Sequence, residues 1–218
     1  MKNIIYFDLD GTISDSAPGI IDSVKYALSY FRIDEKDEKK LNLFIGPPLF
    51  DAFSAVYGMT KEDADRAVEK YRENYNKNGA IYNFNIYDGV EDMLKALKKA
   101  SKKLYIATAK PTEFAKKILD RADLSKYFDN IYGASFDETR RTKTAVIEYA
   151  IKENNHKKSD ILMVGDREND VTGAKNNGID VLGVLYGYGS QEELKDAGCK
   201  NIVKTPKEVA EFIIEYRI

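Results

Sequence analysis

The chain has 218 residues, of which 43% are hydrophobic and 32% charged, a composition typical of a globular protein with a sizeable core. Its 34 Lys and Arg residues nearly balance 36 Asp and Glu residues, and the net charge of -2 argues against a nucleic-acid-binding or polybasic membrane-binding surface. The single cysteine, Cys199, excludes an internal disulfide and suits a reducing compartment.

We expect no targeting segment at the start of the sequence. Met1 and Lys2 lead directly into a short apolar stretch, which leaves no room for a signal peptide. No apolar run is long enough to span a bilayer. We therefore expect a cytoplasmic protein without a membrane partner.

The first predicted element is a strand at residues 3–7, which ends in two carboxylates. Its apolar run has no alternating polar residues, as in a strand covered on both faces. Asp8 follows at the point where the strand ends, and alternation places Asp10 on the same side. Gly11 allows the backbone to turn away. The two carboxylates are thus spaced to share one divalent cation.

Two other interpretations of this stretch are weaker. An Asp-Gly pair between apolar residues is typical of a β-hairpin turn, but no second alternating strand follows Gly11. An EF-hand calcium loop needs its glycine at the sixth position, whereas Gly11 is the fourth residue counted from Asp8.

Residues 15–82 are predicted to be almost purely helical. Apolar residues at spacings of three and four predict a helix over residues 18–31, and a shorter helix runs through Phe50 and Val56. The charged run at residues 34–40 is expected to be a solvated link. Thr60 is a suitable N-cap for a long helix that reaches about residue 78.

From residue 83 onward, short apolar strands alternate with helices. Strands are predicted at residues 104–107, 130–132, 161–164, 180–184 and 202–203. Three of the predicted helices begin with capping signals, namely Asp88 with Glu91, Ser190 with Glu193, and Thr205 with Glu208. The pattern predicts an α/β fold, a doubly wound, Rossmann-like parallel sheet. Residues 1–14 and 83–218 would form this core, and residues 15–82 an all-helical domain inserted after the first strand.

Polar residues follow several of the predicted strands. Ligands bind beyond the carboxyl ends of the strands in open α/β sheets, so these residues are expected to converge. Asp8 and Asp10 follow the first strand, Thr108 the second, and Asp166 to Asp170 the strand at 161–164. Lys143, near the start of a helix, is placed to point toward the same edge. Together, these charges balance around a phosphate bound to Mg²⁺.

In this order, the segment from Asp8 to Thr12, Thr108, Lys143, and the segment from Gly165 to Asp170 resemble the four motifs of the haloacid dehalogenase superfamily. The resemblance covers essentially the whole chain. The helical insert resembles the small cap that follows the first motif in the phosphoglycolate phosphatase-like branch.

The resemblance implies a role for each matching residue. Asp8 would be the nucleophile, Asp10 the general acid and base, and Thr108 and Lys143 the groups that bind and neutralise the phosphoryl oxygens. Substrate binding would involve Thr108, Ala109, Lys143 and Gly11. Mg²⁺ would be held by the carboxylates of Asp8 and Asp166 and by the backbone carbonyl of Asp10. Asp170 would contribute through a bound water.

The implied activity is hydrolysis of a small phosphorylated metabolite through an aspartyl-phosphate. Dehalogenases lack an acid at the position of Asp10, so its presence favours phosphoryl transfer. A β-phosphoglucomutase is the closest alternative, but such mutases place a histidine in the hinge or cap. The single histidine here, His156, falls in a polar segment and is expected to be solvated. A receiver-type signalling domain would be shorter and lack the helical insert.

Two further segments resemble parts of the same branch. Residues 45–49 resemble a cap segment that faces the leaving group, although they also suit a simple helix-initiating turn. Residues 186–189, an alternation of tyrosine and glycine, resemble a loop after a core strand.

We expect a monomer or a weak homodimer. Phosphoglycolate, a 5′-nucleotide and a sugar phosphate all stay open as substrates.

Overall fold

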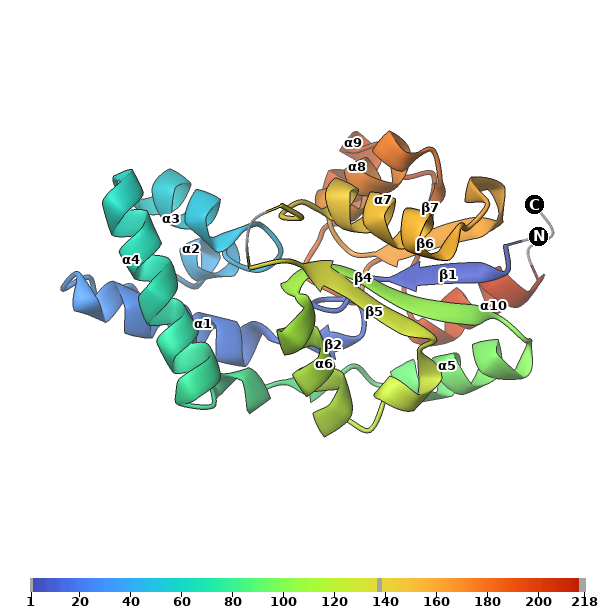
Figure 1. Ribbon diagram of the computed structural model, residues 1–218, viewed down its shortest axis with the longest axis horizontal. Helices are drawn as coiled ribbons and strands as arrows, with labels where there is room; N and C mark the ends of the chain where they lie inside the picture. The colour runs from blue at the N-terminus through green and yellow to red at the C-terminus, as the bar shows by residue number, and fades with distance from the viewer. Residues whose placement is uncertain (1, 137–138, 216–218) are drawn as a thin grey trace. The chain divides into compact units, whose positions relative to one another are not determined.

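The computed structural model describes residues 2–136 and 139–215. The chain divides into two compact units. One comprises Met1–Ser14 and Ile86–Ile218 and is called the sheet unit; the other, Asp15–Asn85, is called the helical unit. Figure 1 shows the elements of each.

The sheet unit is built on a six-stranded sheet with the strand order β5-β4-β1-β6-β7-β8, and its neighbouring strands pair in parallel. The strands are β1 (Ile4–Phe7), β4 (Lys103–Pro111), β5 (Asn130–Ala134), β6 (Ile161–Gly165), β7 (Asp180–Val184) and β8 (Asn201–Val203). Ile5, Tyr6 and Phe7 are fully buried, because helices cover both faces of the central strand. The predicted doubly wound sheet is confirmed.

The described residues of this unit form the α-helices α5 (Val90–Lys99), α6 (Thr112–Arg121), α7 (Lys143–Asn154), α8 (Glu168–Asn177), α9 (Gln191–Asp196) and α10 (Pro206–Glu215). In Figure 1, α7 and α8 lie on one side of the sheet, and α5, α6 and α10 lie on the other. Short 3₁₀ turns cover Ser125–Tyr127 and Lys158–Asp160. Among the described residues, none of the helices combines the length and apolarity needed to cross a membrane.

Two of the three predicted helix caps in this unit are present. The hydroxyl of Ser190 accepts a hydrogen bond from the N–H of Glu193 at 3.0 Å, and that of Thr205 accepts one from Glu208 at 3.2 Å. The predicted cap at Asp88 is wrong. Gly89, at φ +83°, takes that position instead, since a tight turn brings the N–H of Val90 to the carbonyl of Tyr87.

His156 is partly buried, so the expectation that it is solvated is wrong. Its Nδ1 lies 2.8 Å from the hydroxyl of Tyr6 on β1, and its ring packs edge-on against Tyr105 with centroids 4.9 Å apart. Because α7 ends at Asn154, the chain turns back toward the sheet and places the imidazole over these tyrosines. Burial, aided by nearby Lys103, lowers the pKa of His156.

The helical unit contains α1 (Ala17–Tyr30), α2 (Glu38–Asn42), α3 (Leu49–Tyr57) and α4 (Lys61–Arg72), which continues as a π-helical turn at Glu73–Lys77 before a 3₁₀ turn at Ala80–Tyr82. Thr60 caps α4 as predicted, since its hydroxyl accepts from the N–H of Asp63. The charged run is only partly a link, because α2 begins within it at Glu38. Pro48 leads directly into α3, so residues 45–49 do form a helix-initiating turn.

Aromatic and aliphatic side chains fill the interior of the helical unit. The rings of Phe44 and Phe53 lie 4.7 Å apart, and Tyr71 stacks on Tyr75 at 5.2 Å. Gly19 permits the close approach of α1 to the 3₁₀ turn, because a Cβ there would lie 2.2 Å from the carbonyl oxygen of Ala80. Where the chain passes between the two units, β2 (Ser14–Asp15) and β3 (Asn85–Ile86) form a two-stranded sheet.

Candidate active site

The carboxyl ends of the central strands of the sheet unit carry most of the predicted site residues. Asp8 follows β1, and Asp166 follows β6, its neighbour in the sheet. Thr108 lies near the end of β4, two residues beyond Ile106, which pairs with Phe7. Lys143 is the first residue of α7, and Asp170 lies in the first turn of α8. Parallel pairing thus gathers residues that are far apart in the sequence.

Lys143 is a buried ammonium group between two buried carboxylates. Its Nζ lies 2.6 Å from Asp8 Oδ1 and 2.7 Å from Asp170 Oδ1, and it donates a hydrogen bond to the carbonyl of Ala107 at 3.2 Å. Burial alone would lower the pKa of Lys143. The charges of Asp170 and Asp8 outweigh that effect and raise it, so the lysine is firmly protonated.

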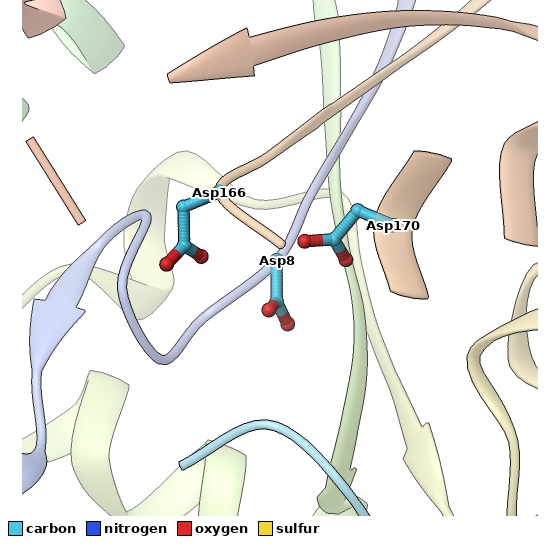
Figure 2. A group of neighbouring side chains, drawn as sticks. All are labelled: Asp8, Asp166 and Asp170. Atoms are coloured by element: carbon cyan, nitrogen blue, oxygen red, sulfur yellow. The ribbon is translucent and has the colours of Figure 1, made fainter. Parts of the chain in front are cut away.

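Asp8, Asp166 and Asp170 form a compact group of carboxylates. Figure 2 shows the three side chains, which come from the loops after β1 and β6 and from the start of α8. One oxygen of each lies within 4.8 Å of the others, and all three residues are buried. Burial, and then the negative charge of its neighbours, raises the pKa of Asp166. Burial also raises the pKa of Asp170, although Lys143 opposes the rise.

This donor set fits a hard divalent cation. Carboxylate oxygens are the ligands that Mg²⁺, Ca²⁺ and Mn²⁺ prefer, and one cation would offset the repulsion that raises these two pKa values. Lys143 supplies only one positive charge to the group. The buried aspartates therefore suit a divalent metal site.

The carboxylate of Asp166 is fixed from two sides. The hydroxyl of Thr12 donates to Oδ1 at 3.2 Å, and the main-chain N–H of Tyr188 donates to Oδ2 at 2.8 Å. Gly11 and Gly187 lie against it, since a Cβ at either position would come within 2.5 Å of Oδ2. The loop after β7, singled out in the sequence for its tyrosines and glycines, thus contributes directly to the site. Its spacing alone did not predict that contact.

Asp170 is held at the start of α8. Its Oδ2 accepts a hydrogen bond from the N–H of Arg167 at 3.1 Å, while Oδ1 faces Lys143. Gly165 allows this arrangement, because a Cβ there would lie 2.2 Å from the carboxyl carbon of Asp170. The helix start therefore sets the orientation of this carboxylate.

Asp10 forms a separate ion pair. Lys110 Nζ lies 2.9 Å from Asp10 Oδ2, and both side chains are largely buried. Within the part of the chain that the structure describes, Asp10 Oδ1 is buried without a hydrogen-bond partner. Thr108 is buried and its Oγ1 accepts from the N–H of Lys110 at 3.2 Å, while Ala109 is half-buried between them. The motif residues singled out in the sequence include Thr108 but not Lys110.

The fold and this group of residues define an enzyme with a doubly wound α/β core. Its acidic and basic side chains lie where such sheets bind ligands. The chain belongs to the haloacid dehalogenase-like hydrolases, since the model of that family matches residues 5–184. The resemblance seen in the four motifs is confirmed.

Known proteins similar to this chain include named phosphatases. A 5′-nucleotidase from Pseudomonas aeruginosa is 40% identical over 191 residues, which cover 88% of this chain and 86% of that protein. A phosphoglycolate phosphatase from Vibrio parahaemolyticus is 26% identical over 218 residues, which cover 96% of this chain and 95% of that protein. A crystal structure described as a predicted phosphatase from Clostridium acetobutylicum superposes with a TM-score of 0.95 at 45% identity, covering 99% of this chain and all of that one.

Proposed function

We propose that this protein is a Mg²⁺-dependent phosphatase that hydrolyses a small phosphomonoester through an aspartyl-phosphate on Asp8. The observation that carries the proposal is the environment of Asp8. This carboxylate lies at the end of the central strand, in an ion pair with buried Lys143, with Asp166 and Asp170 beside it. A second acid, Asp10, follows two residues later.

In the first step, an oxygen of Asp8 attacks phosphorus and the bond to the leaving-group oxygen breaks. Lys143 offsets the charge of the nucleophile and of the phosphoryl group, which removes much of the repulsion between two anions. Thr108 donates its hydroxyl hydrogen to a phosphoryl oxygen. We assign the backbone at Gly11 and Ala109 to the same phosphate-binding site.

Asp10 is the proton carrier. It protonates the leaving oxygen in the first step. In the second step, it takes a proton from the water that attacks the aspartyl-phosphate, which releases phosphate and restores Asp8. The buried Oδ1 of Asp10, without a partner among the described residues, supports this role.

The metal would be held by carboxylate oxygens of Asp8 and Asp166 and by the main-chain carbonyl of Asp10, with Asp170 acting through water. When bound, Mg²⁺ supplies positive charge that orients the phosphoryl group and stabilises its transition state.

The position of His156 supports hydrolysis over mutase chemistry. The only histidine of the chain packs against Tyr6 and Tyr105 on one face of the sheet, where its Nδ1 is already engaged by the hydroxyl of Tyr6. A mutase would need a histidine in the hinge or cap to steer the acid. This chain offers none there.

The named relatives support a proposal for the substrate class. The similar proteins named 5′-nucleotidase and phosphoglycolate phosphatase favour a nucleoside 5′-monophosphate or a small phosphorylated acid. We assign substrate selection to the helical unit, acting as a cap, because residues of the sheet unit alone account for the phosphate chemistry.

The test is phosphate release from a panel that contains 5′-nucleotides, phosphoglycolate and sugar phosphates. Each compound is assayed with Mg²⁺, after removal of divalent cations, and with Asp8→Asn as the blank. We expect release that requires the metal, is lost in the variant, and is concentrated in one compound class.

Two results would contradict the proposal. Full activity after thorough metal removal would remove the metal from the mechanism. No release from any compound by a folded, metal-loaded protein would favour the mutase, and a long-lived aspartyl-phosphate would favour a signalling role.

A further inference from the structure

The ion pair between Asp10 and Lys110 leads to an inference that goes beyond the matching motifs. The Lys110 side chain is only 5% exposed and that of Asp10 11%. Burying an ammonium group is costly unless a partner compensates for the lost hydration. Lys110 is buried beside Asp10, the residue proposed to carry the proton. We therefore examine whether this lysine acts on Asp10.

The backbone of β4 is irregular at this point. Ala107 pairs with Tyr132 and Pro111 with Ala134, so β4 has two more residues than β5 over this stretch. A bulge of this kind changes the direction in which a side chain points. Gly133 makes room for it on β5, because a Cβ there would lie 2.3 Å from the carbonyl oxygen of Lys110. Both strands are thus adapted to the placement of this lysine.

The two oxygens of Asp10 have different surroundings. Oδ2 lies 2.9 Å from Lys110 Nζ, whereas Oδ1 is buried and has no hydrogen-bond partner in residues 2–136 and 139–215. An ammonium group can only donate, so a proton on Asp10 is excluded from the oxygen that faces it. The proton is thereby directed to Oδ1.

We infer that Lys110 is a positioning residue for Asp10: its ammonium group holds Oδ2, so that Oδ1 is the oxygen that exchanges the proton. This inference rests on the proposed phosphatase function. Oδ1–H gives its proton to the bridging ester oxygen as the Asp8–phosphorus bond forms and the bond to the leaving group breaks. Oδ1 then takes a proton from water as that water attacks phosphorus and releases Asp8.

The leaving group separates this role from simple phosphate binding. An alkoxide needs a proton to depart, but p-nitrophenolate departs without one. The test therefore compares kcat/KM for p-nitrophenyl phosphate with kcat/KM for the better of phosphoglycolate and adenosine 5′-monophosphate. The value of kcat/KM reports the steps up to departure of the leaving group and is not affected by later hydrolysis of the aspartyl-phosphate.

For Lys110→Met, we expect kcat/KM for the alkyl ester to fall by about 10- to 100-fold, part of what general acid catalysis supplies, and kcat/KM for p-nitrophenyl phosphate to change by less than about threefold. Lys110→Arg, which keeps a cation beside Oδ2, recovers most of the loss. The matched control is Lys98→Met, which removes a half-exposed lysine paired with Asp129 and leaves kcat/KM for both substrates unchanged.

Equal losses on the two substrates would overturn the inference, because Lys110 would then bind the phosphoryl group or support the fold. Unchanged kcat/KM for both substrates would also overturn it. An inactive wild-type enzyme would instead contradict the proposed function, so the two failures are distinguishable.

A double-mutant cycle keeps the test valid if the single Lys110→Met variant does not fold. Asp10→Asn combined with Lys110→Met removes both partners of the buried pair, which is tolerated better than the removal of one. In the Asp10→Asn background, Lys110→Met should cause no further loss on the alkyl ester. A further loss of about tenfold, a sizeable part of an acid–base contribution, would overturn the inference.

Discussion

The two units of the chain differ in how they treat buried charge. The sheet unit buries several charged side chains, among them Asp8, Lys102, Lys110, Lys143, Asp166 and Asp170. The helical unit, all of which the structure describes, buries three polar residues that carry no charge, Ser16, Ser23 and Asn74. Its ion pairs, such as Lys70 with Glu73, stay partly exposed.

The difference shows that only the sheet unit accepts the loss of stability that buried charges can cause. A buried charge lowers stability unless it is paired, and it is retained where the chemistry requires it. Lys102 is the instructive exception in the sheet unit. It lies at the other end of the strands, donates to the carbonyl of Lys2 and to Asn3 Oδ1, and has its pKa lowered by burial. Its neutral partners mark it as structural.

The largest effect is expected for Asp8→Asn. An amide cannot act as the nucleophile, so turnover should fall by at least about 10³-fold, as for other enzymes that lose a nucleophile. The free energy of unfolding should change by no more than about 1 kcal/mol, because the variant also relieves repulsion from Asp166 and Asp170. Steady-state kinetics and urea unfolding measure the two. Near-normal turnover would remove Asp8 from the nucleophile role.

Lys143→Met should lower the free energy of unfolding more than Asp8→Asn does. It leaves the buried carboxylates of Asp8 and Asp170 without their cation, which should lower the free energy of unfolding by about 3 kcal/mol. Urea unfolding without divalent cations measures the loss. Lys98→Met, which removes a half-exposed pair with Asp129, is the control and should cost less than about 1 kcal/mol. Equal losses in the two variants would contradict the assignment of a special role to the buried pair.

Asn74→Ala probes the helical unit. The Nδ2 group of Asn74 donates to Asp22 Oδ2 at 2.9 Å and to Ser23 Oγ at 3.3 Å. Loss of these bonds should lower the free energy of unfolding by about 1 kcal/mol. The value of kcat for the best substrate of the panel should not change. A large fall in kcat without a change in stability would show that this unit does contain catalytic polar groups.

The smallest effect concerns pH. Burial lowers the folded-state pKa of His156, so the folded protein resists a proton that the unfolded chain accepts near its ordinary pKa of about 6.5. This stabilising contribution is present above that value and is lost as the pH falls toward the folded pKa. Because the chain has one histidine, its imidazole signals in NMR follow the titration without ambiguity. A midpoint at or above the ordinary value would contradict the burial argument.

The sequence predicted the sheet well, because buried strands have a strong local signal. The predicted strand at residues 180–184 has the bounds of β7, and β6 extends the strand predicted at 161–164 by only Gly165. The cap predicted at Asp88 failed because a glycine beside it has access to positive φ. His156 failed because the turn after α7, rather than local polarity, decides its burial.

The site was harder to predict beyond its motif positions. That Asp8, Asp166 and Lys143 converge follows from parallel pairing, which the alternation of strands and helices indicates. The contact between Lys110 and Asp10 depends on a bulge in β4, and the contact between Tyr188 and Asp166 depends on the path of a loop. Neither feature has a local sequence pattern, since each is set by packing against a distant strand.

The central place of β1 has a consequence for how the chain folds. The strand is synthesised well before its two neighbours in the sheet, at residues 103–106 and 161–164. Pairings of such long sequence separation form slowly, and the apolar run Ile4–Phe7 stays exposed until they do. The sheet around the strand that presents Asp8 is therefore completed only after residues 161–164 have been synthesised. A nascent chain cannot act before its sheet is whole.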